Sequence, residues 1–426
     1  MTIRRGGWAA ALMALAGALF VGTAPAYAQT GFSPGNIVVW RVNGDANYNP
    51  GGSALTNAAT AIFLDQFNPN TAGQTAPTFT VSLPTVVGTL AQNDSGTATS
   101  NGFFTRSQNS TQLITPGYDA ALGTASVAGS NPATITRSIG AVNEQGLVNS
   151  STGFNNGPSN NFRSAAGDGL GNLWASTAGS ATTAGIFHIP SADFGTVGAA
   201  VAVANGNWRN IRIFNNSLFG TSGSASPGQG LHLVGSVGTL PTGPESTTFV
   251  PGTGTSGSGA PSPYGFWFFD NPLNGANWNG TGFDTLYVAD DRSVANGGGL
   301  QRWVYDGVNW NISDTITLVD GTSATGAFRG LAASIDTTGQ PIVQLWLTTV
   351  ASGNGSNQLV TITDTLSAGG GTFGSFVSLA TSPENTVFRG VDFTPVPEPT
   401  TLAMLGMVGI GAGWYRWQRG GKRRSG

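Results

Sequence analysis

Short apolar and aromatic runs recur along most of this chain, separated by segments rich in Gly, Ser, Thr and Asn. Such runs between turn-forming residues predict β-strands. Charged residues, which many long helices need, make up only 9% of the chain. The two longest apolar runs lie near the termini, at residues 8–21 and 402–415, and predict one helix at each end. The pattern between them predicts an all-β fold.

The strands form a degenerate repeat of about 45 to 60 residues, which indicates an array or a β-propeller. Each unit opens with a strand in which an aromatic residue lies beside Arg or Gly: residues 102–105, 162–165, 208–211, 264–267, 328–331 and 388–391. Second strands are predicted at residues 113–115, 173–177, 218–222, 286–290 and 345–349. Third strands are predicted at residues 135–137, 185–189, 230–234, 300–305 and 358–362, and a fourth at 315–319.

The sixth unit leaves no room for three more strands before the C-terminal tail. The N-terminal region offers them at residues 37–42, 61–64 and 79–83. A ring closed by strands from both ends would bury the open edges of this blade. We therefore predict a propeller of six blades, with seven as the nearest alternative. A pair of β-sandwiches is a competing fold, and a right-handed β-helix would need shorter repeats.

One turn carries a resemblance of its own. The segment Asp168-Gly169-Leu170-Gly171-Asn172-Leu173-Trp174 is similar to the Asp-x-x-Gly-Asn-Leu-aromatic turn of many β-propeller blades. Asp supplies turn hydrogen bonds, and Gly adopts positive φ at little cost. The resemblance covers seven residues and supports the propeller prediction.

The N-terminus is typical of a secretory signal peptide over residues 1–28. Arg4 and Arg5 give a positive start, an apolar core follows, and Ala26 and Ala28 flank a small-x-small cleavage site. The mature chain would begin at Gln29. A permanent N-terminal membrane helix is the alternative.

The C-terminus, residues 395–426, has three parts in a fixed order. Pro397, Glu398 and Pro399 form a stiff stalk, because each proline lacks an N–H and fixes φ. An apolar run follows that can enter lipid. The run ends in a basic cluster that stays on the cytoplasmic side of a bilayer: Arg416, Arg419, Lys422, Arg423 and Arg424.

This tail resembles the PEP-CTERM family of sorting tails over residues 396–424. The resemblance implies processing by an exosortase-type membrane protease in a Gram-negative host that makes exopolysaccharide. It further implies export across the inner membrane, a transient membrane anchor, and a final place at the cell surface or outside the cell. The tail departs from a stable membrane span because its apolar run is short and glycine-rich. An ordinary C-terminal membrane anchor is the alternative.

Removing both signals changes the charge of the protein. Residues 29–399 hold ten arginines against 20 acidic residues, a net charge of −10. Such a segment lacks the basic patch that a nucleic-acid partner requires, so we predict none. The chain has no cysteine, which excludes thiol catalysis and zinc–thiolate sites. Residues 29–394 are predicted to form the propeller domain.

No set of residues predicts catalysis. The two histidines, His188 and His232, lie at similar places in third strands, either as a metal or acid–base pair or as ordinary buried residues. Residues 31–35 match Gly-x-Ser-x-Gly without the strand–turn–helix context of a nucleophile elbow. Asp290 and Asp291, with Asp270 and Asp284 nearby, indicate a solvated turn, with calcium binding or glycoside hydrolysis as alternatives. No cofactor is predicted.

Arginines give the stronger signal. Arg163, Arg209, Arg329 and Arg389 recur at one position of the repeat. Each guanidinium either pairs with an acid or carbonyl between blades, or joins a ring that faces the channel and holds an anionic sugar or carboxylate. Trp278, Trp303 and Trp310 are candidate exposed aromatics for stacking on sugar rings.

The leading hypothesis is an exported cell-surface propeller that binds or organises an extracellular partner. The polysaccharide part of this hypothesis, exopolysaccharide or matrix, comes from the resemblance of the tail. The rival hypothesis is an extracellular hydrolase whose Asp, Glu and His residues meet at the channel. A purely structural matrix protein is the third.

Overall fold

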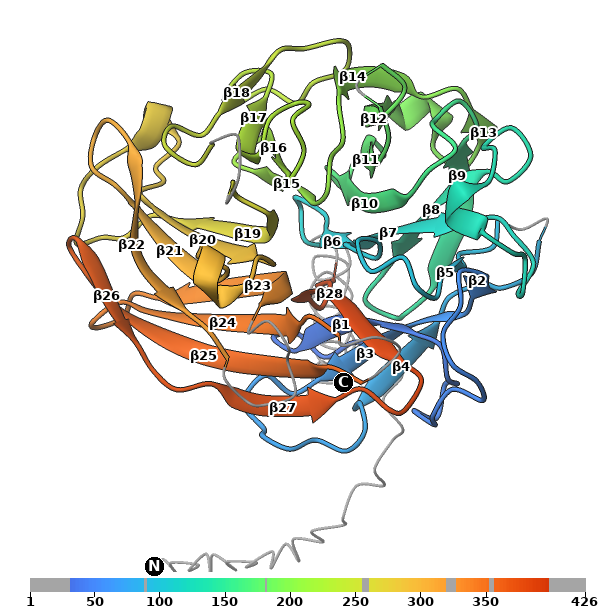
Figure 1. Cartoon of the computed structure of the whole chain (residues 1–426), viewed down its shortest axis with the longest axis horizontal. Helices are drawn as coiled ribbons and strands as arrows, with labels where there is room; N and C mark the ends of the chain where they lie inside the picture. The colour runs from blue at the N-terminus through green and yellow to red at the C-terminus, as the bar shows by residue number, and fades with distance from the viewer. Residues whose placement is uncertain are drawn as a thin grey trace, which may run out of the picture.

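The computed structural model describes residues 31–87, 90–180, 182–254, 260–318, 327–351 and 356–397. Within these residues six antiparallel sheets stand around a central axis, and Figure 1 looks down the ring. The prediction of a six-bladed β-propeller is confirmed. We number the sheets as blades 1 to 6 along the ring and give each from its innermost strand outward.

Blade 1 consists of β28 (Val387–Phe393), β1 (Ile37–Val42), β3 (Ile62–Phe67) and β4 (Phe79–Ser82). Blade 2 consists of β6 (Thr105–Arg106), β7 (Leu113–Tyr118), β8 (Arg137–Val142) and β9 (Val148–Phe154), with β13 (Val197–Gly198) parallel to β9. Blade 3 consists of β10 (Phe162–Gly167), β11 (Leu173–Thr177), β12 (Gly185–Ile189) and β14 (Val201–Asn205).

Blade 4 consists of β15 (Ile211–Phe214), β16 (Ser217–Ser222), β17 (Gly230–Val234) and β18 (Thr247–Phe249). Blade 5 consists of β19 (Pro263–Phe269), β20 (Thr285–Asp290), β21 (Gly299–Tyr305) and β22 (Trp310–Ile316). Blade 6 consists of β23 (Phe328–Asp336), β24 (Ile342–Thr349) and β25 (Gln358–Ser367), whose outer edge pairs with β26 (Gly370–Phe373) and β27 (Val377–Thr381).

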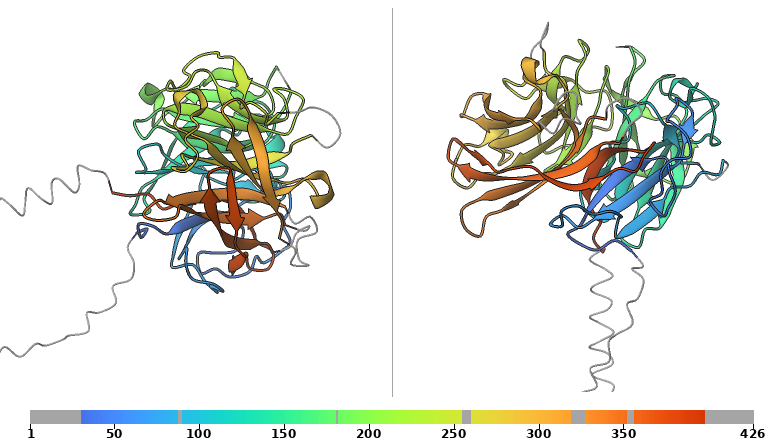
Figure 2. Two further views of the ribbon diagram at one scale, coloured as in Figure 1. Left: turned by 90° about the vertical axis from the view of Figure 1, so that its left-hand side faces the viewer. Right: turned by 60° about the horizontal axis from the view of Figure 1, so that its bottom comes forward.

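Strands from the two ends of the domain close the ring in blade 1. β28 is antiparallel to β1, from Ile37 opposite Phe393 to Val42 opposite Val387. Thr394 then donates its N–H to the Asn36 carbonyl at 3.0 Å. The first and last described residues therefore lie on the same face of the ring (Figure 2). β28 thus completes blade 1 as its innermost strand, in line with the strands missing from the sixth unit.

Some predicted strand bounds were wrong. In blade 2 the third strand begins at Arg137, so Ile135 precedes it. The inner strand of this blade shrinks to β6, because the Phe103 backbone bonds to the neighbouring blade instead: its N–H donates to the Arg163 carbonyl at 3.0 Å. The predicted fourth strand at 315–319 overlaps only the end of β22.

The short β2 (Ala59–Thr60) and β5 (Asp94–Ser95) pair outside the six blades. The described residues hold only three-residue 3-10 helices: η1 (Val127–Gly129), η2 (Ser191–Asp193), η3 (Trp278–Gly280) and η4 (Val294–Asn296). None of the helices in the described part of the chain is long and apolar enough to span a membrane.

The predicted terminal helices lie outside the described residues. The signal peptide with Ala26 and Ala28 falls there, as do Glu398, Pro399 and the basic cluster. Pro397 is the last described residue.

The hydrophobic core lies between the blades, where the sheets pack face to face. Trp40, Trp174, Trp208, Trp278 and Trp310 are among the largest fully buried side chains. Each blade thus buries both of its faces except at its outer edge. A blade can do so only with a neighbour on each side, which is why the ring must close.

The turn that resembles a propeller motif forms as predicted. The Asp168 carboxylate accepts the Leu170 N–H at 2.6 Å and the Asn172 N–H at 3.1 Å. Gly169 and Gly171 adopt φ of 80° and 103°. Asp306 and Asp336 cap turns of the same kind, and hydrogen bonds to backbone N–H groups lower the pKa of both carboxyls.

Candidate functional site at one end of the channel

The repeated aromatic–Arg pairs mark one end of the central channel. The four aromatic side chains of these pairs are at most 2% exposed: Phe162, Trp208, Phe328 and Phe388. Successive side chains in an extended chain point to opposite sides, so the residue after each aromatic faces away from this core. These next residues are the four arginines, and the positive charges of Arg209 and Arg329 both act on Arg163. We call this end the arginine mouth; it comprises Arg163, Arg209, Arg329, Arg389, Asp94, Asp291, Phe103 and Tyr264.

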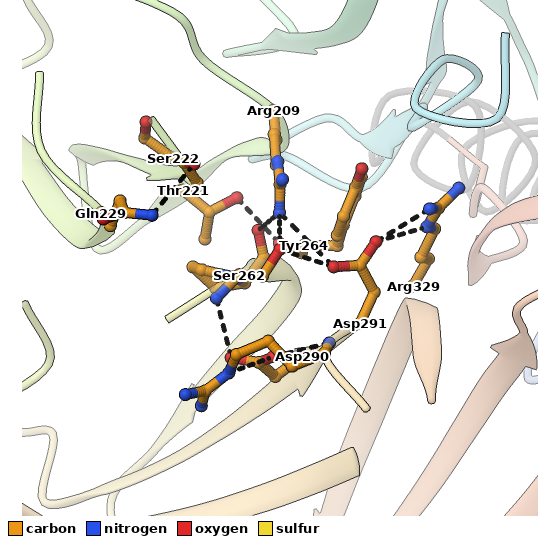
Figure 3. A network of polar contacts seen from close by, with 12 residues as sticks. Arg209, Thr221, Ser222, Gln229, Ser262, Tyr264, Asp290, Asp291 and Arg329 are labelled. Carbon is orange, nitrogen blue, oxygen red and sulfur yellow. Dashed lines mark hydrogen bonds and ion pairs between the residues drawn. The ribbon is translucent and has the colours of Figure 1, made fainter. Parts of the chain in front are cut away.

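Asp291 bridges two of the arginines. Its carboxylate accepts from Nε and Nη2 of Arg329 at 3.0 and 2.8 Å and lies 3.8 Å from Nη1 of Arg209 (Figure 3). The Ser262 hydroxyl donates to the same carboxylate at 2.6 Å. The side chains of Asp291, Arg209 and Arg329 are 13 to 18% exposed, so the bridge reaches the surface of the mouth.

Tyr264 lies between Arg209 and Arg329 (Figure 3). The guanidinium carbons of Arg209 and Arg329 lie 4.1 and 4.7 Å from the centroid of its ring. Because an aromatic face is electron-rich, the Tyr264 ring attracts both guanidinium groups. On its other side the ring contacts Phe103 of blade 2, with 5.4 Å between centroids. Blades 2 and 5 face each other across the ring (Figure 1), so this contact joins opposite blades at the mouth.

Arg389 is buried beneath a loop. It donates to the Asp94 carboxylate at 2.7 Å and to the carbonyls of Ser95 and Gly96 at 2.7 and 2.9 Å. The same loop reaches Arg329, whose Nη1 donates to the Thr99 carbonyl at 2.8 Å. The segment between β4 and β6 therefore covers one side of the mouth.

Arg163 has no carboxylate partner among the described residues. Its Nη1 donates to the Asn207 side-chain oxygen at 2.7 Å and to the Trp208 carbonyl at 3.1 Å. Its Nε is buried without a hydrogen-bond partner. Burial, together with the nearby charges of Arg209 and Arg329, lowers the pKa of Arg163 to about 10. The mouth thus holds four guanidinium groups against the two carboxylates of Asp94 and Asp291.

The opposite end of the channel is different. Nη1 of Arg212, in blade 4, lies 2.9 Å from the Asp392 carboxylate, in blade 1 on the far side of the ring. Asp392 also accepts the Arg106 N–H at 2.8 Å. Arg212 and Asp392 are 6% and 0% exposed, and we call them the axial pair. The axial pair holds opposite blades together and is sealed from solvent.

The expectation of exposed tryptophans was wrong. Trp278, Trp303 and Trp310 are 2, 7 and 1% exposed and belong to one core cluster of blades 4 and 5. Trp278 and Trp310 pack edge to face at 6.1 Å, and both indole N–H groups lack hydrogen-bond partners. Their faces therefore stabilise the core and offer no platform for a sugar ring.

The two histidines are buried, and each packs against a tryptophan of the core. His188 stacks on Trp174 with 5.1 Å between rings, and burial lowers its pKa. His232 lies between Trp208 and Phe249, and burial lowers its pKa to about 4. The described residues hold no group of three or more His, Cys, Asp or Glu that could bind a metal ion.

The remaining candidates have structural partners. Ser33, from the Gly-x-Ser-x-Gly match, accepts the Thr394 hydroxyl on its carbonyl and anchors the last described segment. The solvated turn expected at Asp290 was wrong, because that carboxylate is fully buried and pairs with Arg292 at 2.9 Å. Asp284 is likewise buried, and burial raises its pKa to about 6.

Sequence reasoning did not group the acidic residues of the arginine mouth with its arginines. Asp94 lies in the short strand β5 and Asp291 lies in a loop, both outside the repeat, so no period marks them. Tyr264 could have been found, because Gly265 follows it where other units have Arg. A Cβ on Gly265 would lie 2.7 Å from the Arg329 carbonyl, which excludes any side chain there.

One protein-family model matches the chain. Residues 395–416 match the PEP-CTERM protein-sorting motif, so the chain carries this tail directly after its last propeller strand. The tail suggests that this propeller is an exported and sorted protein. Such a tail implies processing by an exosortase and association with a membrane before surface display. No curated protein matches the chain.

Proposed function

We propose that this protein is a cell-surface propeller that binds acidic polysaccharide, or another ligand that bears carboxylates, at the arginine mouth. One observation carries the proposal: four guanidinium groups share one end of the channel with only two carboxylates. The excess positive charge lies in a domain whose overall charge is strongly negative. A bound anion would balance it.

Arg163 is the residue we assign to first contact with the ligand. Buried charges are normally paired, because desolvating an unpaired ion costs several kcal/mol. Arg163 is largely buried, and its described partners are an amide and a carbonyl oxygen, which leave its charge uncompensated. Guanidinium groups bind carboxylates bidentately, so an acidic sugar suits this position.

The position of the tail supports a surface role. β28 carries Arg389 near the mouth, and its other end continues into residues 394–397. Val396 donates its N–H to the Ser110 carbonyl at 2.9 Å, so the fold extends to the edge of the sorting motif. Val396 lies seven residues beyond Arg389, at most about 23 Å along the chain. A protein held by its tail would therefore turn the mouth away from the membrane.

The targeting steps belong to the same proposal. Residues 1–28 direct export and are removed after Ala28. Residues 395–426 hold the chain in the membrane through residues 402–415 and the basic cluster until an exosortase-type protease acts near Pro397, Glu398 and Pro399. Exopolysaccharide is the extracellular partner in this proposal, because the resemblance of the tail implies a host that makes it.

The test is binding of the full-length protein, purified in detergent, to acidic and neutral oligosaccharides. We expect acidic uronate oligomers to bind and neutral ones of the same length not to. Arg163→Gln should weaken uronate binding about tenfold, since it removes one charge-assisted contact. Arg106→Gln is the matched control, because Arg106 lies at the other end of the channel, where its N–H and side chain contact Asp392 and Thr394.

Two results would contradict the proposal. Equal binding of neutral and acidic oligomers would show that charge does not select the ligand. Equal losses in the Arg163 and Arg106 variants would show that the arginine mouth is not the site.

A further inference from the structure

We propose that Asp291 is an internal competitor that sets the affinity of the arginine mouth for anions. This inference rests on the proposed function. The Asp291 carboxylate takes the place between Arg209 and Arg329 that the carboxylate of a ligand would otherwise fill. Asp291 is therefore a residue that determines specificity, in addition to its part in the fold.

The geometry around Asp291 is that of a bound ligand. Arg329 donates two hydrogen bonds to one carboxylate oxygen, and Ser262 and Arg209 flank the other. The ring of Tyr264 contacts both guanidinium groups and helps to fix their positions. A carboxylate from outside would find the same donors in the same positions, so the site is preorganised for this group.

Asp291 can leave this position without unfolding the blade. Its backbone is held independently, because its N–H donates to the Ser262 carbonyl at 3.2 Å and the preceding Asp290 is fully buried. The next residues, 293–297, are exposed in the connection that contains η4. A rotation of one side chain would free both arginines.

The other carboxylate of the mouth differs. Asp94 is 2% exposed, as is its partner Arg389, and the carbonyls of Ser95 and Gly96 complete the coordination of that guanidinium. A ligand cannot replace Asp94 without removing the covering loop. Only Asp291 is both ion-paired and open to solvent among the carboxylates of the mouth.

The test compares Asp291→Asn with the wild type in full-length protein, using a uronate hexamer as the probe at low ionic strength. Removing one negative charge beside two guanidinium groups should tighten binding about tenfold. Asp314→Asn is the matched control: Asp314 is 48% exposed, pairs at 3.8 Å with Arg302 and lies on β22, the outer strand of blade 5. The control should bind as the wild type does.

Asp291→Ala is tested as well, because the side-chain amide of Asp291→Asn can form hydrogen bonds of its own in the mouth. Circular dichroism confirms that each variant is folded. Tighter binding by either Asp291 variant, with Asp314→Asn unchanged, supports the inference, even where the wild type binds below detection. Unchanged or weaker binding by both folded Asp291 variants overturns it. That result leaves the proposed function intact if Arg163→Gln still weakens uronate binding, whereas no uronate binding by the wild type or any variant removes both.

Discussion

The two ends of the channel are built from the same residue types and differ in solvent access. At the arginine mouth, Asp291 and its two arginines are 13 to 18% exposed. At the other end, the axial pair is at most 6% exposed and joins opposite blades. The charge balance differs as well, since the mouth holds four arginines and two acids. The buried axial pair helps to close the ring, whereas the partly exposed Asp291 bridge leaves a site for a ligand.

The largest expected effect comes from breaking the axial pair. Asp392→Ala leaves the Arg212 guanidinium buried without its carboxylate, so we expect a loss of about 3–5 kcal/mol in the free energy of unfolding. Urea denaturation measures this. The double variant Arg212→Met with Asp392→Leu should recover most of the loss, because it removes both charges together. A loss below about 1 kcal/mol in Asp392→Ala would show that the axial pair does not hold the ring.

The next largest expected effect is a pH dependence of stability caused by His232, which lies at neither end of the channel. Burial lowers its pKa to about 4 in the folded state, against an ordinary value of 6.5. The unfolded chain therefore binds the proton more readily between these values, and stability falls as the pH drops from 6.5 toward 4. At pH 4.5 the expected loss relative to pH 7 is about 2 kcal/mol.

His232→Gln should remove this part of the pH dependence, as measured by urea denaturation at both pH values. His188→Gln is a natural comparison, because burial also lowers the pKa of His188. An identical pH dependence in wild type and His232→Gln would contradict the prediction.

Asp291→Ala sharpens the comparison between the ends. Because the Asp291 bridge is partly solvated, its loss should cost about 1 kcal/mol, well below the cost at Asp392. Thermal unfolding of the two alanine variants under one set of conditions gives the ranking. The comparison fails if the Asp291 variant is the less stable of the two.

The smallest effect on stability is expected in the sorting motif. Val396 makes the last described hydrogen bond, so replacing Pro397, Glu398 and Pro399 by alanine should change the free energy of unfolding by less than about 0.5 kcal/mol. The same variant should stay unprocessed, visible as a larger protein in membrane fractions. Normal size and location would refute processing at this motif.

Much of the fold could be predicted because the repeat records it locally. The aromatic–Arg pairs at Phe162, Phe328 and Phe388 mark innermost strands, since a strand with one face in the core alternates in polarity. The missing strands of the last unit predicted closure between β1 and β28. Strand lengths were harder to predict: Phe103 leaves its own sheet for a neighbouring blade, a choice between two partners that local pattern does not encode.

The candidate site was only half predictable. The four arginines share a repeat position, so the sequence could group them. Their partner Asp94 lies in the short strand β5 outside the blades, and Asp291 lies in a loop after β20. The exposure assigned to Trp278, Trp303 and Trp310 was wrong. Loop residues follow no sequence period, and the identity of an aromatic residue in a strand does not tell whether its side chain faces the core or the solvent.

By itself, the sequence determined the all-β class and the sorting tail, favoured six blades over seven, and predicted how the ring closes, because each depends on residues close together or on a regular spacing. Only the tertiary structure decided which arginines are neutralised. Arg212 meets Asp392 from across the ring, whereas Arg163 meets no described carboxylate. The reason is physical: the energy of an ion pair depends on distance and solvent access, and both are set by how six separate blades close around one axis.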